Sequence, residues 1–498
     1  MFTASASFLF FDYFRVPYET TAEGNAWSTQ LGAGHPLRST GWLSGQGSDF
    51  STRYLHWIPK GADSLGRNGR GPKARYLLGT IPIFGEVVGD VLLEELLDDT
   101  GAKWHRTAPI RNAAGQHVGS IWKDDDGSVF LPFDPDEIIR NFWSEAYKTM
   151  EPSTGPRLKH IAMRAYYRLR PAIPRSSQIW MRQLFSKVQA RSRFPRWPVE
   201  TALHDFYAHL FKTVAELVER PVPWIAPWPK QYSWALVLTH DVDTGEGFRN
   251  LNLLRQAEVK AGYRSSWYFV PRRYPFDQKI VRELTEEGFE VGVHGLYHDG
   301  RDFDSLRTLT DRLPAMNAYG RSWHARGFRS PSTHRVWEWM TLLDFDYDSS
   351  YPDTDPFEPQ PGGCCTWLPY FNQDLVELPI TLPQDHTLFV ILRQPDESLW
   401  LEKTSYLKAH GGMAVLNTHP DYMLVDGRLE AYVRFLQVYA GEAEVWRALP
   451  YEVNDWWRRR AASCLELVSG EWRIIGPAAG EGAISFTTDT QASLTGVA

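Results

Sequence analysis

Apolar and polar positions along the second half of the chain follow two alternating periods. Short apolar runs rich in Val, Leu and aromatic residues are typical of buried strands, and the stretches between them show the spacing of amphipathic helices. The predicted strands include 232–243, 265–270, 289–295, 325–331 and 412–419, and the predicted helices include 248–262, 276–288 and 304–320. The rhythm continues through 346–351, 375–380, 387–392 and 398–411. This alternation predicts parallel strands with helices outside them, as in a (β/α) barrel.

The first 150 residues have a different pattern, in which β-branched and aromatic runs are broken by Gly and Asp. Residues 75–85 and 115–133 indicate strands, and the run Asp124–Asp126 followed by Gly127 indicates a solvated hairpin turn. We therefore expect a mixed, β-rich α/β domain here.

A chain of 498 residues exceeds what one core usually supports, because single cores stop growing near ~250–300 residues. The predicted parts are an N-terminal domain (1–150), a basic helical linker region (151–225), the barrel (226–450) and a C-terminal helix end with a small β element (451–498). Within them we expect a helix at 204–219, a proline-rich linker at 221–230 and helix throughout 428–463. Residues 465–476 and 482–490 predict a small β-hairpin element.

The net charge of −7 hides one strongly basic segment. Residues 152–199 contain eleven Lys and Arg and neither Asp nor Glu, so the rest of the chain is more acidic than the sum suggests. The overall balance argues against a nucleic-acid partner, whose binders are dominated by basic surface. The segment either meets an anionic surface or carrier, or is a helical linker whose arginines pair with acids elsewhere.

Three cysteines, Cys364, Cys365 and Cys464, do not form the even set of a disulfide framework, which favours a reducing, cytoplasmic location. The N-terminal residues lack the basic region of a signal peptide. No apolar stretch approaches the ~18–20 residues of a membrane helix.

Chemistry-bearing residues stand at the ends of the predicted strands. Asp241 and Asp243 end the first strand, and His294 and His298 follow another. Two His four residues apart on a helical turn can reach one metal ion, and a carboxylate would complete a catalytic set with room for water. His419 ends a late strand and could supply the acid that a leaving group needs.

In this order the motifs of 232–450 resemble the polysaccharide deacetylase family, also called NodB-homology or carbohydrate esterase family 4 domains, in a divergent branch with a T-H-D-V-D first motif. The resemblance implies a distorted (β/α)7-type barrel. It also implies the site residues: the metal ligands Asp243, His294 and His298, the base Asp241, the third-motif residues Arg329 and Pro331, and the general acid His419. Arg329 is expected to bond Asp241.

The sequence departs from the family pattern at several positions. Val242 separates the two aspartates, which the family usually has adjacent, and Ser332 replaces the aromatic residue after Pro331. The backbone N–H of Ser332 could still serve an oxyanion hole. Asn417 stands where a Leu usually lines the acetyl pocket. The fourth motif matches poorly, so the partner that orients His419 stays open between Asp348 and Asp353.

Together these features predict a metal-dependent carbohydrate deacetylase, with zinc as the expected ion. The predicted substrate-binding residues are Pro331, Ser332, Asn417 and Tyr297. Aromatic rings such as Trp267, Tyr297 and Trp367 either floor a sugar cleft or fill the core. The expected substrate is an N-acetylated sugar of an intracellular glycan precursor, lipid- or nucleotide-linked, whose phosphates the basic 152–199 segment could bind.

Two alternatives remain open on the sequence. An O-acetyl esterase or a hydrolase of a non-sugar amide would use the same metal site. A glycan-binding scaffold that kept the barrel would belong to a different class of protein. Such a scaffold would have no need of the full set of six residues, which are Asp241, Asp243, His294, His298, Arg329 and His419.

Overall fold

The computed structural model describes residues 2–20, 38–44, 51–60, 71–98, 100–150, 175–190, 194–425 and 427–487. Most of the predicted basic segment, at 151–174 and 191–193, lies outside these residues. The chain divides into two compact units. Unit 1 comprises Met1–Thr154, Thr201–Ala226 and Arg459–Ala498, and unit 2 comprises Gly155–Glu200 and Pro227–Arg458. Each unit thus combines segments that are far apart in the sequence.

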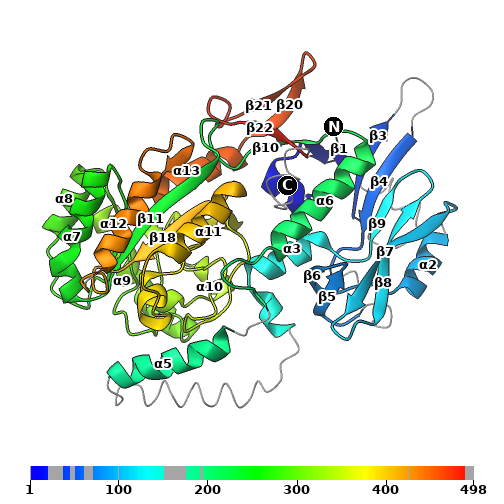
Figure 1. Ribbon diagram of the computed structural model, residues 1–498. Coiled ribbons are helices and arrows are strands. Elements are labelled where there is room, and N and C mark those ends of the chain that lie inside the picture. The colour runs from blue at the N-terminus through cyan, green and yellow to red at the C-terminus, as the bar shows by residue number, and fades with distance from the viewer. Residues whose placement is uncertain are drawn as a thin grey trace. The chain divides into compact units, whose positions relative to one another are not determined.

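Unit 1 is built on a nine-stranded mixed sheet (Figure 1). Its strands, in spatial order, are β2 (Tyr18–Thr20), β1 (Phe2–Ala4), β3 (Arg38–Ser44), β4 (Ser51–Trp57), β9 (Val129–Leu131), β8 (His117–Asp124), β7 (Trp104–Asn112), β5 (Ala74–Leu78) and β6 (Ile81–Gly85). The strands predicted at 75–85 and 115–133 are confirmed, and Asp124–Gly127 forms the turn between β8 and β9.

The described helices of unit 1 are α1 (Leu9–Phe14), α2 (Asp90–Asp98), α3 (Pro135–Trp143), η3 (Ala146–Thr149) and α6 (Ala202–Val218). Local sequence explains where α3 begins. Asp134 accepts hydrogen bonds from the backbone N–H groups of Asp136 and Glu137, and Pro135 occupies the first helical position, where no N–H is needed. The predicted helix at 204–219 is confirmed as α6.

The prediction that 221–230 is an irregular linker was wrong for its first half. Residues Pro223–Ile225 form β10, which pairs antiparallel with β22 (Ile484–Phe486). A proline is tolerated in such a strand because a two-stranded sheet has only edges, where a missing N–H breaks no internal ladder. The C-terminal hairpin is confirmed as β20 (Cys464–Val468) and β21 (Glu471–Ile475).

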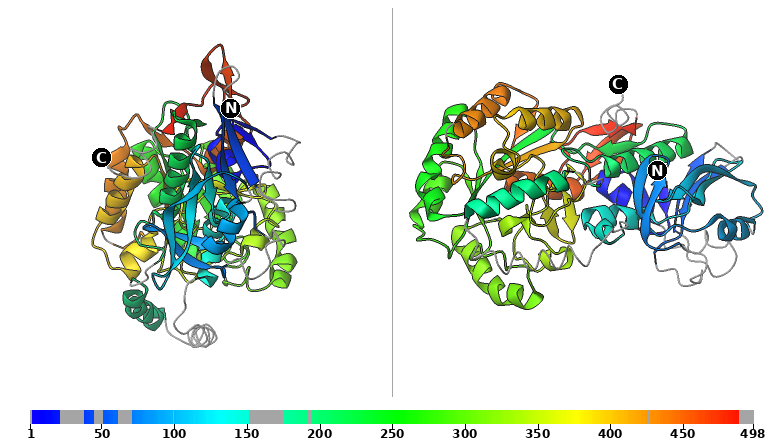
Figure 2. Two further views of the ribbon diagram at one scale, coloured as in Figure 1. Left: turned by 90° about the vertical axis from the view of Figure 1, so that its right-hand side faces the viewer. Right: turned by 60° about the horizontal axis from the view of Figure 1, so that its bottom comes forward.

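Unit 2 contains a largely parallel sheet with helices around it, which confirms the predicted α/β class (Figure 2). The main path runs through β16 (Tyr370–Asn372), β17 (Leu375–Glu377), β15 (Tyr347–Asp348), β14 (Gly327–Phe328), β13 (Glu290–Val293), β12 (Ser266–Phe269), β11 (Trp234–Val242) and β18 (Met413–Thr418), and β19 (Val445–Arg447) also pairs with β11. Among the described strands of this sheet, β16 alone pairs antiparallel. Every residue of β11 is buried, as in a parallel strand covered on both faces.

The described helices and turns of unit 2 lie before, between and after these strands in the sequence. They are α5 (Arg175–Gln189), α7 (Gly245–Ala261), α8 (Lys279–Glu286), α9 (Leu306–Trp323), η5 (Pro331–Thr333), α10 (Trp337–Met340), the π-helical η6 (His386–Ile391), α11 (Ser398–Ala409), α12 (Arg428–Tyr439) and α13 (Pro450–Ala461), which extends past the unit boundary. Among the described helices, none is both long enough and apolar enough to cross a lipid bilayer.

The two ends of the parallel row are joined by irregular backbone. The Leu382 N–H donates to the Val415 carbonyl at 3.0 Å. The Thr381 hydroxyl donates to the carbonyl of Met413 and accepts from the N–H of Val415, both in β18. The sheet therefore curls so that the segment after β17 approaches β18.

One predicted element of unit 2 was wrong. Residues 428–463 are not continuous helix, because β19 separates α12 from α13 and pairs with the start of β11. Tertiary pairing thus overrides local helical spacing at Val445–Arg447.

Large aromatic side chains fill the core of unit 2. Trp267 and Trp367 are fully buried, so they are core residues and do not floor a cleft. All three cysteines are free, and the reducing compartment stays a prediction.

Candidate metal centre and acid–base pair

Four parallel strands deliver the candidate residues to one edge of the sheet. Arg329 follows β14, His294 follows β13, Asp241 lies at the end of β11, and His419 follows β18. These strands belong to one hydrogen-bonded row. The carboxyl ends of parallel strands meet at one edge, so residues far apart in the sequence come together there.

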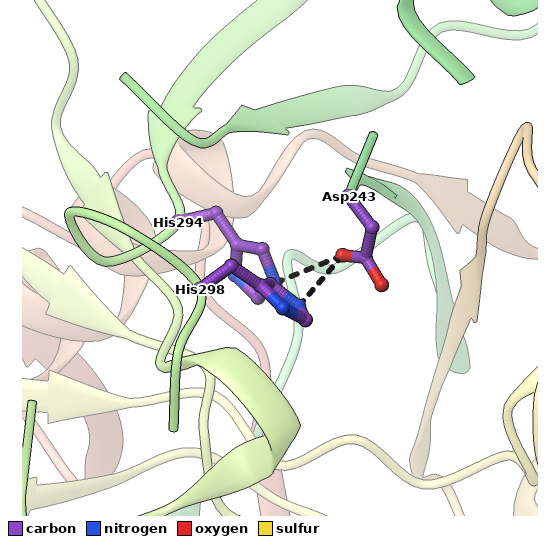
Figure 3. Close-up of side chains that lie close together, drawn as sticks. All are labelled: Asp243, His294 and His298. Atoms are coloured by element: carbon purple, nitrogen blue, oxygen red, sulfur yellow. Dashed lines mark ion pairs between the residues drawn. The ribbon is translucent and has the colours of Figure 1, made fainter. Parts of the chain in front are cut away.

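Asp243, His294 and His298 form a cluster suited to a metal ion (Figure 3). Their potential ligand atoms all lie within 4.8 Å of one another. One oxygen, Oδ1 of Asp243, lies 2.9 Å from His298 Nε2 and 3.4 Å from His294 Nε2. The cluster brings together two imidazole nitrogens and one carboxylate, which leaves coordination positions for water or substrate.

Two further observations support the fit of this cluster to a metal. The Nδ1 of His294 lies 2.9 Å from the Arg329 carbonyl, which can only accept a hydrogen bond. Nδ1 therefore carries a proton, and Nε2, which faces Asp243, is the ring nitrogen left to bind a metal ion. Within the described residues, the buried Oδ1 of Asp243 has no hydrogen-bond partner, although both Nε2 atoms are near. Such an atom suits a metal ligand better than a structural carboxylate.

The loop between the two histidines depends on a glycine. Gly295 has φ of +61°, and a Cβ at this position would lie 2.6 Å from Pro331 Cδ and would also collide with the Asp302 carboxylate. Arg312, in α9, forms an ion pair with Asp302, with Nη1 and Oδ1 2.7 Å apart, and this ion pair supports the loop. The glycine thus lets Pro331 pack directly against the backbone that carries His294.

Asp241 is held by an arginine and an amide. Arg329 Nη1 donates to Oδ1 at 3.1 Å, which confirms the expected contact, and Asn417 Nδ2 donates to Oδ2 at 2.8 Å. Burial raises the pKa of Asp241, but the charges of His294 and Arg329 outweigh it and lower the pKa below its ordinary value. The carboxylate therefore stays ionised and can accept a proton.

Asp385 orients His419, and the sequence-based choice between Asp348 and Asp353 was wrong. Asp385 Oδ1 lies 2.6 Å from His419 Nδ1, and its Oδ2 accepts the backbone N–H of His419 at 2.7 Å. Asp348 instead bonds Ser350, and Asp353 pairs with Lys403 at 2.8 Å. Asp385 immediately precedes η6, where no motif marks it.

The environment keeps His419 protonated. Burial lowers its pKa, but the charge and hydrogen bond of Asp385 and the more distant aspartates raise it to about 10. Since Asp385 occupies Nδ1, the opposite ring nitrogen is the one that can donate outward. It lies 3.8 Å from Asp241 Oδ2.

The other predicted substrate residues differ in their surroundings. Tyr297 is 39% exposed and lies beneath the Arg312 guanidinium, 5.0 Å from its ring centre. Ser332 is half-buried with φ of +55°, in the sharp turn that follows Pro331. Asn417 is buried, with its side chain bonded to Asp241. Substrate contacts of all four residues, Pro331 included, stay predictions.

Comparison with known proteins gives a weak likeness to a number of solved structures, three of which are described here. No protein-family model matches the chain, and no curated protein matches it. A protein of Mycobacterium smegmatis named provisionally as a polysaccharide deacetylase is 19% identical, with a TM-score of 0.39 over 49% of this chain and 98% of its own. Puue allantoinase is 16% identical, with a TM-score of 0.38 over 46% and 91%. A protein of Pseudomonas aeruginosa PAO1, also named provisionally as a polysaccharide deacetylase, is 17% identical, with a TM-score of 0.38 over 47% and 93%.

At these scores we infer function from the side chains alone.

The structure also shows a supporting cluster around His240 whose role was not inferred from the sequence. His240 is next to Asp241 in the sequence. Its Nδ1 lies 2.8 Å from the Thr418 hydroxyl, and its Nε2 lies 2.6 Å from a carboxylate oxygen of Glu258. Ser265 and Tyr432 also donate to Glu258. This fully buried cluster ties the end of β11 to the end of β18, so it fixes the spacing of Asp241 and His419.

Proposed function

We propose that the protein is a metal-dependent hydrolase that removes an N-acetyl group from an amino sugar in a glycan or glycan precursor. One observation carries this proposal: a single oxygen, Asp241 Oδ2, is close both to a histidine of the metal cluster and to the acid. It is 3.7 Å from His294 Nε2 and 3.8 Å from His419 Nε2. An amide bound beside this oxygen would have the base, the acid and the metal cluster within reach at the same time.

The two side chains divide the proton transfers of amide hydrolysis. Asp241, ionised and held by Arg329, takes a proton from the attacking water. His419, protonated through Asp385, gives its proton to the leaving amine nitrogen as the C–N bond breaks. The products are acetate and the free amino sugar. One water is consumed. Asp241 has gained one proton and His419 has lost one, so exchange with solvent restores both groups without a net change in protons.

Asp243, His294 and His298 would hold the ion, and zinc suits their nitrogen and oxygen donors. When bound, such an ion lowers the pKa of water and polarises a carbonyl. The described cluster has no thiolate, so other first-row divalent ions also fit.

The order of the sequence motifs supports an acetylated sugar as the substrate and a distorted (β/α)7-type barrel as the fold of unit 2. We extend the proposal to a lipid- or nucleotide-linked sugar precursor in a reducing compartment. A second candidate is an O-acetyl esterase or a non-sugar amide hydrolase. It is favoured by Asn417, whose polar side chain stands where an apolar residue would line an acetyl pocket.

Acetate release and metal content measured on matched variants test the proposal. Asp241→Asn and His419→Gln should keep the ion and lower kcat by about 10²–10⁴-fold, the range of general acid–base catalysis. Asp243→Ala should lose both ion and activity. Asp277→Asn, which changes an exposed carboxylate of unit 2, should behave as wild type. Full activity of zinc-free protein or of Asp243→Ala would refute the mechanism.

A further inference from the structure

The outward face of α5 is apolar. Trp180, Leu184 and Val188 are spaced four residues apart and are 59%, 46% and 56% exposed. Residues at this spacing lie on one face of a helix, so the three side chains form a continuous stripe. A surface helix normally turns such a stripe toward the core.

Among the side chains of α5 that the structure describes, polar ones contact the rest of unit 2. Arg182 Nη2 donates to the Phe357 carbonyl at 3.2 Å, and Gln183 Nε2 donates to the Val390 carbonyl at 2.7 Å. Ser186, on the same side, is buried. Polar contacts thus hold α5 along the outside of unit 2 (Figures 1 and 2). The high exposure of Trp180, Leu184 and Val188 shows that the apolar stripe faces outward.

The charge of the surrounding sequence indicates what kind of partner would bind this stripe. Residues 152–199, which include α5, carry eleven Lys and Arg and no acidic residue. Two copies of the chain meeting through this stripe would bring like charges together, which opposes association. An anionic surface would gain from the same charges.

We propose that α5 docks the protein on an anionic phospholipid surface. Trp180, Leu184 and Val188 enter the boundary between headgroups and acyl chains, and the positive charge that the sequence of 152–199 carries favours an anionic surface over a neutral one. An amphipathic helix with aromatic and aliphatic residues on one face and Lys and Arg elsewhere has the character of an interfacial helix. The docking does not depend on the proposed chemistry.

The position of α5 gives docking a consequence for the site. Val390, which accepts the bond from Gln183, belongs to η6, and η6 begins directly after Asp385. A helix docked on lipid would therefore hold the segment that orients His419 close to the surface. If the proposed function holds, a membrane-borne sugar carrier is the substrate that benefits.

Co-sedimentation of the full-length protein with phospholipid vesicles tests the docking. One set of vesicles contains about one-third phosphatidylglycerol in phosphatidylcholine, and the other is phosphatidylcholine alone. The test variant is Trp180→Ser/Leu184→Ser/Val188→Ser. The matched control, Leu253→Ser/Val259→Ser/Val438→Ser, removes three apolar side chains of similar exposure, 44%, 57% and 56%, from α7 and α12. A charge variant, Arg175→Gln/Lys187→Gln, leaves the Arg182 contact in place.

Wild type and control should bind the anionic vesicles and not the neutral ones. The stripe variant should partition about tenfold or more weakly, because three apolar side chains no longer enter the lipid. The charge variant and added salt should also weaken binding. The proposal is overturned if wild type ignores anionic vesicles, if it binds neutral vesicles equally, or if the stripe or charge variant binds as wild type. A vesicle-free dimer that the stripe variant converts to monomer would likewise overturn it, in favour of an interface between copies. None of these outcomes requires deacetylase activity.

Discussion

Asp385 binds His419 through both of its carboxylate oxygens. One oxygen lies 2.6 Å from the ring nitrogen Nδ1, and the other accepts the backbone N–H of the same residue at 2.7 Å. The side chain therefore fixes both the position of the residue and the orientation of its ring. It leaves Nε2 facing Asp241.

Replacement of Asp385 should shift the pH dependence of the reaction. The raised pKa of His419, about 10, keeps the acid protonated at neutral pH, and burial alone would lower it. Asp385→Asn removes the negative charge, so the alkaline limb of kcat/KM should move to lower pH by about one unit or more, since a hydrogen bond to a charged group is worth ~1.5–3 kcal/mol. Asp348→Asn, the rejected candidate, should leave the limb in place. An unmoved limb in Asp385→Asn would show that His419 is not the acid.

Gly295 should be required for metal binding. Gly295→Ala places a Cβ against Pro331 and Asp302, and the strain should weaken zinc binding by about tenfold or more, as for other groups that support metal ligands. Gly300→Ala is the matched control, because Gly300 has φ of +74° but its Cβ would meet only His334, at 3.7 Å. Calorimetric titration of both variants with zinc measures the difference. Equal affinities would mean that the contact with Pro331 does not position His294.

Glu258 should contribute to both stability and turnover. It accepts bonds from His240, Ser265 and Tyr432 inside the core. Glu258→Gln introduces an amide donor among these donors, so we expect a loss of roughly 3 kcal/mol in unfolding free energy, as when buried ion pairs are broken. At temperatures where the variant is folded, kcat should fall with little change in KM or zinc content. Denaturant unfolding and steady-state kinetics measure these effects, and an unchanged kcat would restrict the cluster to stability.

Asn417 should act through Asp241. Its amide donates to Asp241 and to Gln384, and its carbonyl accepts from Arg329 at 2.8 Å. Asn417→Leu should lower kcat by about ten- to a hundredfold, since unpaired buried polar groups cost ~1–3 kcal/mol each. Zinc content should not change. If the variant gained activity on N-acetyl sugars relative to acetyl esters, Asn417 would be a determinant of substrate choice instead.

The sequence predicted the residues at strand ends and missed those in irregular backbone. Asp241, His294 and His419 could be grouped because parallel strands end at one edge, and the apolar runs before them are easily recognised. Asp385 could not, because it lies in a segment without regular periodicity before η6. Asp348 and Asp353 were both candidates because they lie in or just after a predicted strand, but Asp348 bonds Ser350 and Asp353 pairs with Lys403.

The pairing of strands that are far apart in the sequence could not be predicted either. The pairing of β10 with β22 joins residues about 260 positions apart, and no local pattern in 221–230 indicates its distant partner. Likewise β19 interrupts helical spacing only because β11 offers it a neighbour. The structural partner of a strand was therefore harder to predict than the strand itself.

Mass spectrometry of N-acetylated amino sugars, and of their lipid- and nucleotide-linked conjugates, tests the central claim most directly. After incubation with zinc-loaded protein, at least one conjugate should lose one acetyl group with release of acetate. Chelation or Asp243→Ala should stop the reaction, and zinc should restore it in the chelated wild type. Loss of acetyl from O-acetyl esters alone, or an undiminished reaction with Asp243→Ala, would contradict the account.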